Sequence, residues 1–330
     1  MHELVLIFTD LFIAAGAPRP QSAPALPALS TLVSRGQSRT TGDWRRWALQ
    51  EYACHDTDRV PVAAISRRAA TSQVEERDSR SWWVATPVHL EAGLTQVRMG
   101  EQLPYLDGEE WDTLANGFNR AFAVDGFSLE AGHASGFISA RTMLDASTVD
   151  PLRLLGQNVE LALPSGPGSA PLRRLLTEVQ MWLHDHPLNE KREQRGLPTV
   201  NGLWIWGGGV EPAGLRAAKL PHLATELPFL SGLWRLLKGP AAVPAASFAA
   251  LRTQQIDRAI VALTCMSDTR SPARALDSIE QEWMAPALRA FKVGGLRRVL
   301  LHVNDRLFTI TRADMYRFWR PRLSWLESVA

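Results

Sequence analysis

WLHDHPLNEKR (residues 182–192) and NGLWIWGGG (residues 201–209) are the two stretches of this sequence that decide the fold. The first ends a helical pattern with a charged turn, and the second holds a short apolar run that stops at three glycines. Such a run is typical of a buried strand. Glycine adopts positive φ without steric cost, so the backbone there can come close to another group. Because ligands of open α/β sheets bind beyond the carboxyl ends of strands, we expect a ligand-binding loop at Gly207, Gly208 and Gly209.

Apolar runs alternate with helical patterns along most of the chain. Strands are predicted at 4–9, 203–206, 259–265 and 298–303, and helices at 171–184, 273–291 and 312–319. This alternation predicts an α/β fold with a doubly wound, mostly parallel sheet. The segment 81–168 has a different texture of short strands and turns, which predicts an inserted, smaller α+β subdomain. The predicted α/β core therefore comprises 1–80 and 169–330.

Composition bounds the class of protein. The chain has 330 residues, and a net charge of +2 without a long basic run gives no reason to expect a nucleic-acid partner. Its two cysteines, Cys54 and Cys265, fit a reducing cytoplasm better than a disulfide framework. Glu3 and Asp10 interrupt the first apolar run, which argues against a signal peptide. No run of 18 apolar residues occurs, so we expect no membrane-spanning helix and a cytoplasmic protein.

The opening motif also carries a family resemblance. His186-Pro-Leu-Asn189, Arg192, Gly196 and the stretch 201–209 resemble a segment of the archaeal-type, cofactor-independent phosphoglycerate mutases. Those enzymes belong to the alkaline phosphatase superfamily. The whole chain resembles still more closely a group of bacterial regulatory proteins of the RpfE type. The resemblance implies an alkaline phosphatase-like core. For an active phosphomutase it further implies two divalent metals held by Asp and His residues, and a serine or threonine nucleophile.

Candidates for this machinery can be matched to the chain one at a time. Asp10 follows the first strand, where the family keeps a metal-binding aspartate, and its alternative role is to cap the chain that follows. The family's nucleophile segment matches best at 41–52, where Gly42 takes the serine position and Thr41 lies one residue away. The simpler interpretation is that Thr40 or Thr41 N-caps a helix beginning near Trp44.

The remaining metal ligands of the family are mostly replaced. Asp268 lies after the strand at 259–265, but no histidine follows it. After the last strand, Asp305 matches a family aspartate, whereas Arg306 takes the place of the histidine. A guanidinium cannot coordinate a metal, although it can pair with a phosphate or carboxylate. Asp10 and Asp305 alone would hold Mg²⁺ or Mn²⁺ only weakly, so no tightly bound cofactor is expected.

Two roles are open for the motif residues His186, Asn189 and Arg192. They match the family residue by residue, and they either contact a ligand or hold a structural turn by binding backbone carbonyls or a neighbouring acid. The sequence does not distinguish these two roles.

Two functional hypotheses follow. The first is a non-catalytic regulatory or ligand-binding protein on a degenerate phosphoglycerate-mutase-like scaffold, which binds a small anionic metabolite or a partner protein. Its ligand-binding residues would be His186, Asn189, Arg192, Gly207, Gly208, Gly209 and Arg306, with Asp305 beside them. The alternative is a metal-dependent phosphomutase or phosphatase acting on a small phosphoester. In that case Thr41 is the nucleophile, and Asp10 and Asp305 are metal ligands.

Overall fold

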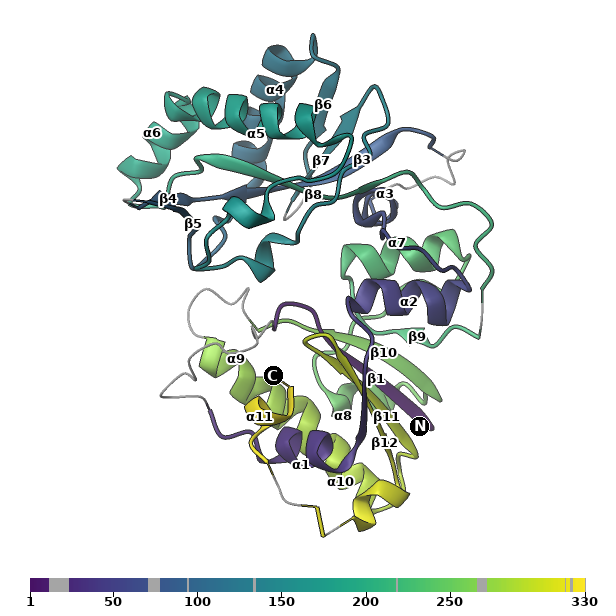
Figure 1. Ribbon diagram of the computed structural model, residues 1–330. Helices are drawn as coiled ribbons and strands as arrows, with labels where there is room; N and C mark the ends of the chain where they lie inside the picture. The colour runs from purple at the N-terminus through teal and green to yellow at the C-terminus, as the bar shows by residue number, and fades with distance from the viewer. Residues whose placement is uncertain are drawn as a thin grey trace. The chain divides into compact units, whose positions relative to one another are not determined.

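The protein consists of two compact units, which Figure 1 draws with their helices and strands labelled. Unit 1 comprises Met1–Asp56 and Leu215–Ala330, and unit 2 comprises Thr57–Gly214. The structure is a computed structural model. It describes residues 1–11, 24–70, 78–93, 95–132, 135–217, 219–265, 272–317, 319–320 and 323–329.

A six-stranded sheet forms the centre of unit 1 in the described part of the chain, with the order β2-β12-β11-β1-β10-β9. Its strands are β1 (Glu3–Phe8), β2 (Gln37–Thr40), β9 (His222–Leu223), β10 (Arg258–Leu263), β11 (Arg298–Val303) and β12 (Arg306–Thr311). β9, β10, β1 and β11 are parallel, whereas β12 runs antiparallel to β11 and β2 antiparallel to β12. The run Leu4–Ile7 is fully buried, as expected for a central strand that is covered on both faces.

Helices cover both faces of this sheet. They are α1 (Pro27–Arg35), α2 (Trp44–Ala53), α7 (Pro228–Leu236), α8 (Phe248–Thr253), α9 (Pro272–Ile279), α10 (Ala285–Lys292) and α11 (Trp325–Val329). A π-helical turn, Glu280–Met284, joins α9 to α10. Leu301 of β11 packs in one core cluster with Leu29 of α1 and Phe291 of α10. His302, the next residue on the strand, instead lies against Trp47 of α2 with ring centroids 6.0 Å apart. Since neighbouring strand residues point to opposite faces, α2 and α10 lie on opposite sides.

Unit 2 is built on an antiparallel sheet. Over the described residues its strands are ordered β6-β7-β3-β8. They are β3 (Ser81–Val88), β6 (Phe127–Glu130), β7 (Gly136–Ala140) and β8 (Gly202–Gly209), and β4 (Leu90–Ala92) and β5 (Val97–Met99) form a separate hairpin. The helices are α3 (Val62–Arg67), α4 (Gly108–Phe122), α5 (Ser169–His184) and α6 (Pro187–Gln194). Trp83 of β3, Phe118 of α4 and Val179 of α5 pack in one core cluster. Unit 2 is therefore an α+β unit with its own hydrophobic core.

The predicted fold class is confirmed, but unit 2 is larger than the predicted insertion. The sequence placed the inserted subdomain at 81–168, whereas the compact unit runs from Thr57 to Gly214. The physical reason is strand pairing, because β8 hydrogen-bonds to β3 and not to the parallel sheet. Leu203 and Ile205 of β8 then enter the same core as Trp83. An apolar run that was expected in the parallel sheet therefore belongs to the antiparallel one.

The carboxyl-terminal segment also differs from the prediction. Over the described residues the last strand is β12, which forms a hairpin with β11. Within the described part of the predicted helix at 312–319, the structure has a single 3₁₀ turn, Ala313–Tyr316. The closing helix is α11 further along the chain. Among the described helices, none has the length and the apolar character needed to cross a membrane.

Candidate functional site

Asp10 lies just beyond the carboxyl end of β1, as predicted, and its side chain is buried. Its two carboxylate oxygens accept hydrogen bonds from the backbone N–H of Cys265, at 2.9 and 3.0 Å. The Cys265 thiol also donates to Asp10, at 3.3 Å. Asp10 thus joins the chain after β1 to the chain after β10.

Thr41 contacts a histidine that sequence reasoning missed. The Thr41 hydroxyl lies 2.8 Å from Nε2 of His302, which is fully buried on β11. The backbone N–H groups of Thr41 and Gly42 both donate to the carbonyl oxygen of Asp305, at 3.0 and 3.2 Å. These bonds place the hydroxyl beside the carboxyl end of β11. A histidine inside the apolar run of β11 was the available signal, because a buried polar group needs a partner.

The helix that follows Thr41 is capped by a different residue from the one predicted. Asp43 is the N-cap of α2, and its side chain accepts from the N–H of Arg45 at 2.7 Å. The prediction that Thr40 or Thr41 caps this helix is therefore wrong. Aspartate next to the first helical residue is an equally good cap, and Gly42, with φ of 69°, turns the chain before it.

Asp305 and Arg306 lie at the turn between β11 and β12. Arg306 is the first residue of β12, and its guanidinium donates to the carbonyl oxygen of Ser328, in α11, at 3.1 Å. The neighbouring Asn304 donates to the carbonyl oxygen of Val329, also at 3.1 Å. Asn304 and Arg306 therefore bind the carbonyl end of α11, where the positive charge of Arg306 is favourable.

A pair of divalent metals does not fit the residues that the structure describes. Within the described ranges, no three His, Cys, Asp or Glu side chains come close enough together to hold a metal ion. A bridged pair needs several such ligands at once. Asp268, the other aspartate considered from the sequence, lies outside the described residues.

The motif residues His186 and Asn189 hold the connection from α5 to β8. His186 is the N-cap of α6, and its Nδ1 accepts from the N–H of Leu188 at 3.2 Å. The Asn189 amide donates to the carbonyls of Leu183 and Val200, each at 2.9 Å, and accepts from the Val200 N–H at 2.8 Å. Burial lowers the pKa of His186, and the charge of Arg120 lowers it further. A neutral imidazole suits this cap, since Nδ1 must accept a hydrogen bond.

Arg192 is the most deeply buried charged residue of the motif, with 1% of its surface exposed. Its guanidinium contacts both carboxylate oxygens of Glu110 in α4, at 2.9 and 2.8 Å. It also donates to the carbonyl oxygens of Pro198 and Tyr105, at 2.7 and 3.1 Å. Arg192 thus ties α4 to the segment between α6 and β8. These contacts match the structural role that the sequence left open.

The glycines 207–209 form the end of strand β8 and not a loop, contrary to prediction. They allow a close approach within the protein. Gly207 has φ of 62°, and a Cβ atom built on it would lie 2.7 Å from the Cβ of Val62 in α3. A Cβ on Gly208 would overlap the indole of Trp83. The small residues let β8 lie close to α3 and to the Trp83 side chain of the neighbouring strand β3.

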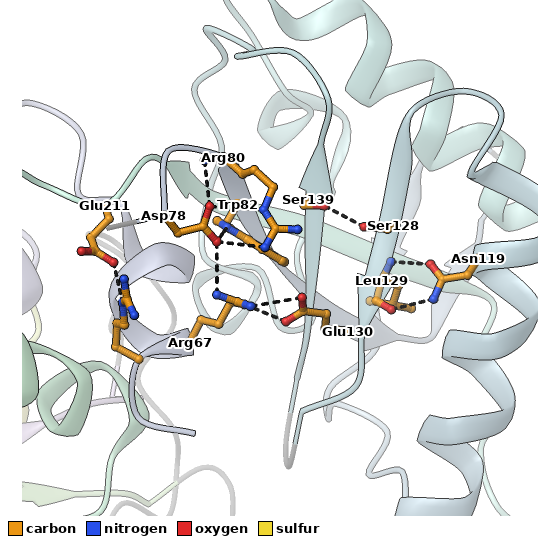
Figure 2. A network of polar contacts seen from close by, with 11 residues as sticks. Arg67, Asp78, Arg80, Trp82, Asn119, Ser128, Leu129, Glu130, Ser139 and Glu211 are labelled. Atoms are coloured by element: carbon orange, nitrogen blue, oxygen red, sulfur yellow. Dashed lines mark hydrogen bonds and ion pairs between the residues drawn. The ribbon is translucent and has the colours of Figure 1, made fainter. Parts of the chain in front are cut away.

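A charge network fixes α3 to the strands of unit 2 (Figure 2). Arg67 donates to Glu130 at 2.6 Å and to Asp78 at 3.3 Å, and its guanidinium lies 4.1 Å from the Trp82 ring. Burial alone would raise the pKa of Asp78, but hydrogen bonds from Arg80 and Trp82 hold it below its ordinary value. An aspartate with several donors of this kind stays ionised and supports structure.

The predicted site residues fall into two groups. Thr41, Asp305 and Arg306 come together around the β11–β12 turn of unit 1, where His302 joins them, and Asp10 lies in the same unit on the chain after β1. The remaining predicted residues belong to unit 2, and they are His186, Asn189, Arg192, Gly207, Gly208 and Gly209. Within unit 2, Arg192 and Gly207 contact different elements.

Comparison with known proteins finds partial similarity to phosphoglycerate mutases. A probable 2,3-bisphosphoglycerate-independent phosphoglycerate mutase of Geobacter sulfurreducens is 33% identical over 66 residues, which cover 20% of this chain and 16% of that protein. The 2,3-bisphosphoglycerate-independent phosphoglycerate mutase of Methanothrix thermoacetophila is 28% identical over 111 residues, covering 30% of this chain and 27% of the relative. The alignments therefore span well under a third of either relative. No protein-family model matches the chain.

Two solved structures align with most of the chain, both at TM-scores below 0.5. The cofactor-independent phosphoglycerate mutase of Thermoplasma acidophilum aligns with 94% of this chain and 90% of its own, at a TM-score of 0.38 and 16% identity. The PH0037 protein of Pyrococcus horikoshii aligns with 94% of this chain and 87% of its own, at a TM-score of 0.47 and 12% identity. The two sequence relatives support the resemblance to phosphoglycerate mutases in part of the chain, whereas that to RpfE-type regulatory proteins stays a prediction.

Proposed function

We propose that this chain is a non-catalytic ligand-binding or regulatory protein on a phosphoglycerate-mutase-like scaffold, and that it binds a small anionic metabolite or a partner protein. The observation that carries the proposal is Arg306. It stands where the resembling mutases keep a metal-binding histidine, and its guanidinium donates to the carbonyl oxygen of Ser328. A permanent cation at this position repels a metal ion and favours an anion.

Other residues support the same proposal. Gly42 takes the position of the family's nucleophile and has no hydroxyl to offer. Both carboxylate oxygens of Asp10 accept a hydrogen bond from the backbone N–H of Cys265, and one of them also accepts from the Cys265 thiol. Asn189 and Arg192 keep the family's residue types while bonding inside unit 2. A non-catalytic relative would keep the residues that stabilise the fold and lose the nucleophile and the metal ligands.

A thermal-shift titration tests the proposal. We expect 3-phosphoglycerate, 2-phosphoglycerate or inorganic phosphate at millimolar concentration to raise the melting temperature, since a ligand at 100 times its Kd stabilises by about 2.7 kcal/mol. Glycerol serves as the uncharged control. Arg306→Gln should reduce the shift, each variant being compared with its own unliganded state. Arg297→Gln makes the same charge change at the amino end of β11 and should leave the shift intact.

The binding proposal would be contradicted by either of two results. One is that none of the three anions stabilises the protein at millimolar concentration. The other is that Arg306→Gln and Arg297→Gln give the same shift, because the anion then binds elsewhere.

One contact favours a second function, a phosphomutase or phosphatase with Thr41 as nucleophile. The 2.8 Å separation of the Thr41 hydroxyl from Nε2 of His302 is the geometry of a nucleophile and its general base. The imidazole would accept the hydroxyl proton while the Thr41 oxygen attacks phosphorus, and the P–O bond to the ester alcohol would break as that alcohol takes the proton and leaves. Water, or a second hydroxyl of the substrate, would then take the phosphoryl group from Thr41. This function predicts turnover of a small phosphoester that Thr41→Val abolishes. Turnover that is equal in both proteins would exclude Thr41.

A further inference from the structure

Unit 2 contains a cavity of about 370 Å³ that no part of the proposed function uses. It lies between α5, the β4–β5 hairpin, the end of β3, the start of β8 and the turn Glu160–Ala162. Figure 1 shows α5, β4, β5 and β8 within the same part of unit 2. The volume falls within the range of small-molecule sites, about 300–1,000 Å³.

Most of the residues that line the cavity are apolar, and its uncharged polar side chains are those of Thr177 and Gln180 in α5. Val88, Leu90 and Val97 come from three strands, and Leu176 comes from α5. Trp204 of β8 also lines it, and its one polar atom, Nε1, already donates to the carbonyl oxygen of Val149 at 2.8 Å. Trp204 therefore offers the cavity only apolar carbon. Such a lining favours a hydrocarbon or aromatic group.

The same cavity has one cation and one anion among its lining residues, Arg173 and Glu160. Arg173 is oriented by a hydrogen bond from its Nε to the carbonyl oxygen of Pro164, at 2.5 Å. Across the described residues neither Arg173 nor Glu160 has an ion-pair partner, and the two do not pair with each other. The next residue, Arg174, is by contrast paired with Glu178 at 2.7 Å. Both side chains are exposed, so the opposite charges at the cavity are available to a ligand that replaces their water.

We infer that this cavity binds a free α-amino acid with an apolar side chain. The α-carboxylate pairs with Arg173, the α-ammonium pairs with Glu160, and the side chain enters the apolar interior beside Leu176 and Trp204. A ligand with only a carboxylate would pair with Arg173 but place its negative charge beside that of Glu160. A ligand with only an amine would pair with Glu160 but place its positive charge beside that of Arg173. A zwitterion satisfies both charges at once. The inference is independent of the function of unit 1.

Isothermal titration of the full-length protein with L-leucine, L-alanine and L-phenylalanine tests the apolar part. Leucine carries three more carbons than alanine, and each buried methylene contributes about fourfold in affinity. We therefore expect leucine to bind about fiftyfold more tightly than alanine, and phenylalanine to bind as well. Equal affinity for leucine and alanine would overturn the inference, as would no heat from leucine at millimolar concentration.

Matched pairs of variant and ligand test the two charges. Arg173→Gln should weaken leucine binding about tenfold but leave leucinamide, which has no carboxylate, unchanged. Glu160→Gln should weaken leucine about tenfold but leave N-acetylleucine, which has no ammonium, unchanged. Arg174→Gln is the control, because Arg174 is adjacent but does not line the cavity. Circular dichroism should show all three variants folded, since the side chains are exposed.

Each crossed outcome is decisive. If Arg173→Gln weakens leucine and leucinamide equally, or if Arg174→Gln weakens leucine as much as Arg173→Gln does, no specific carboxylate contact exists. If N-acetylleucine binds more tightly than leucine, the ligand is a plain carboxylate and the assignment to an amino acid is wrong.

Discussion

Replacement of Arg192 by methionine should destabilise unit 2 strongly. Arg192 is almost fully buried and pairs with both carboxylate oxygens of Glu110, which is itself only 9% exposed. Removing the guanidinium leaves a buried carboxylate without its partner, a change that costs about 3–5 kcal/mol. It also frees the carbonyl oxygens of Pro198 and Tyr105. Arg195, with a 3.6 Å contact to Glu110, compensates in part, so we expect about 3 kcal/mol.

Urea unfolding followed by tryptophan fluorescence and far-ultraviolet circular dichroism measures this loss. With a slope of about 1–3 kcal/mol per molar urea, the midpoint should fall by about 1–3 M. Arg195→Met is the matched control. Arg195 contacts the same carboxylate, but its side chain is 56% exposed, so its loss should change the free energy of unfolding by less than about 0.5 kcal/mol.

A double variant separates the ion pair from simple loss of packing. Glu110→Gln removes the buried charge and keeps an acceptor for the N–H of Asp107. In an Arg192→Met background it should recover part of the lost stability, because no unpaired charge is then buried. The reasoning is refuted if Arg192→Met costs no more than Arg195→Met, or if Glu110→Gln lowers the stability of Arg192→Met further.

Three further predictions concern local contacts. Because the folded pKa of His186 lies below the unfolded value of about 6.5, the unfolded chain binds more protons, and stability should fall as pH drops below about 6.5. Between pH 7.5 and pH 5 the urea midpoint should fall less in His186→Asn, which keeps a capping side chain, than in the unchanged protein. An equal fall in both proteins would exclude His186 as the source of the pH dependence. Gly207→Ala should lower the free energy of unfolding by about 1–3 kcal/mol more than Gly214→Ala does. Both glycines have φ above 60°, but only a Cβ atom at Gly207 would meet Val62. Equal melting temperatures of the two variants would contradict this. Asp43→Ala should cost about 1 kcal/mol by loss of the N-cap of α2, whereas Asp43→Ser should restore most of it.

The strands with continuous apolar runs could be predicted from the sequence. The expected strand at 298–303 coincides with β11, and that at 4–9 differs from β1 by one residue at each end. These segments are buried on both faces, so their side chains alone identify them. β2 was missed because its residues, Gln37–Thr40, are exposed and polar, and only their pairing with β12 makes them a strand.

The division into units could not be read from the sequence for a related reason. Leu203–Trp206 has the composition of a parallel-sheet strand, yet it pairs antiparallel with β3. A short apolar run indicates that a strand is buried, but it does not indicate which strand lies beside it in the sheet. The Thr41–His302 contact joins residues 261 positions apart, and nothing in the local pattern of either residue specifies the other. Roles that depend on such long-range contacts require the folded structure.

Anomalous diffraction from crystals grown with manganese tests the central claim most directly. The account predicts no pair of bridged manganese ions beside Thr41 and Asp305, because the resemblance implies that Arg306 replaces a metal-binding histidine. Two strong anomalous peaks within about 4 Å of each other at the carboxyl end of β11, next to the Thr41 hydroxyl, would contradict it.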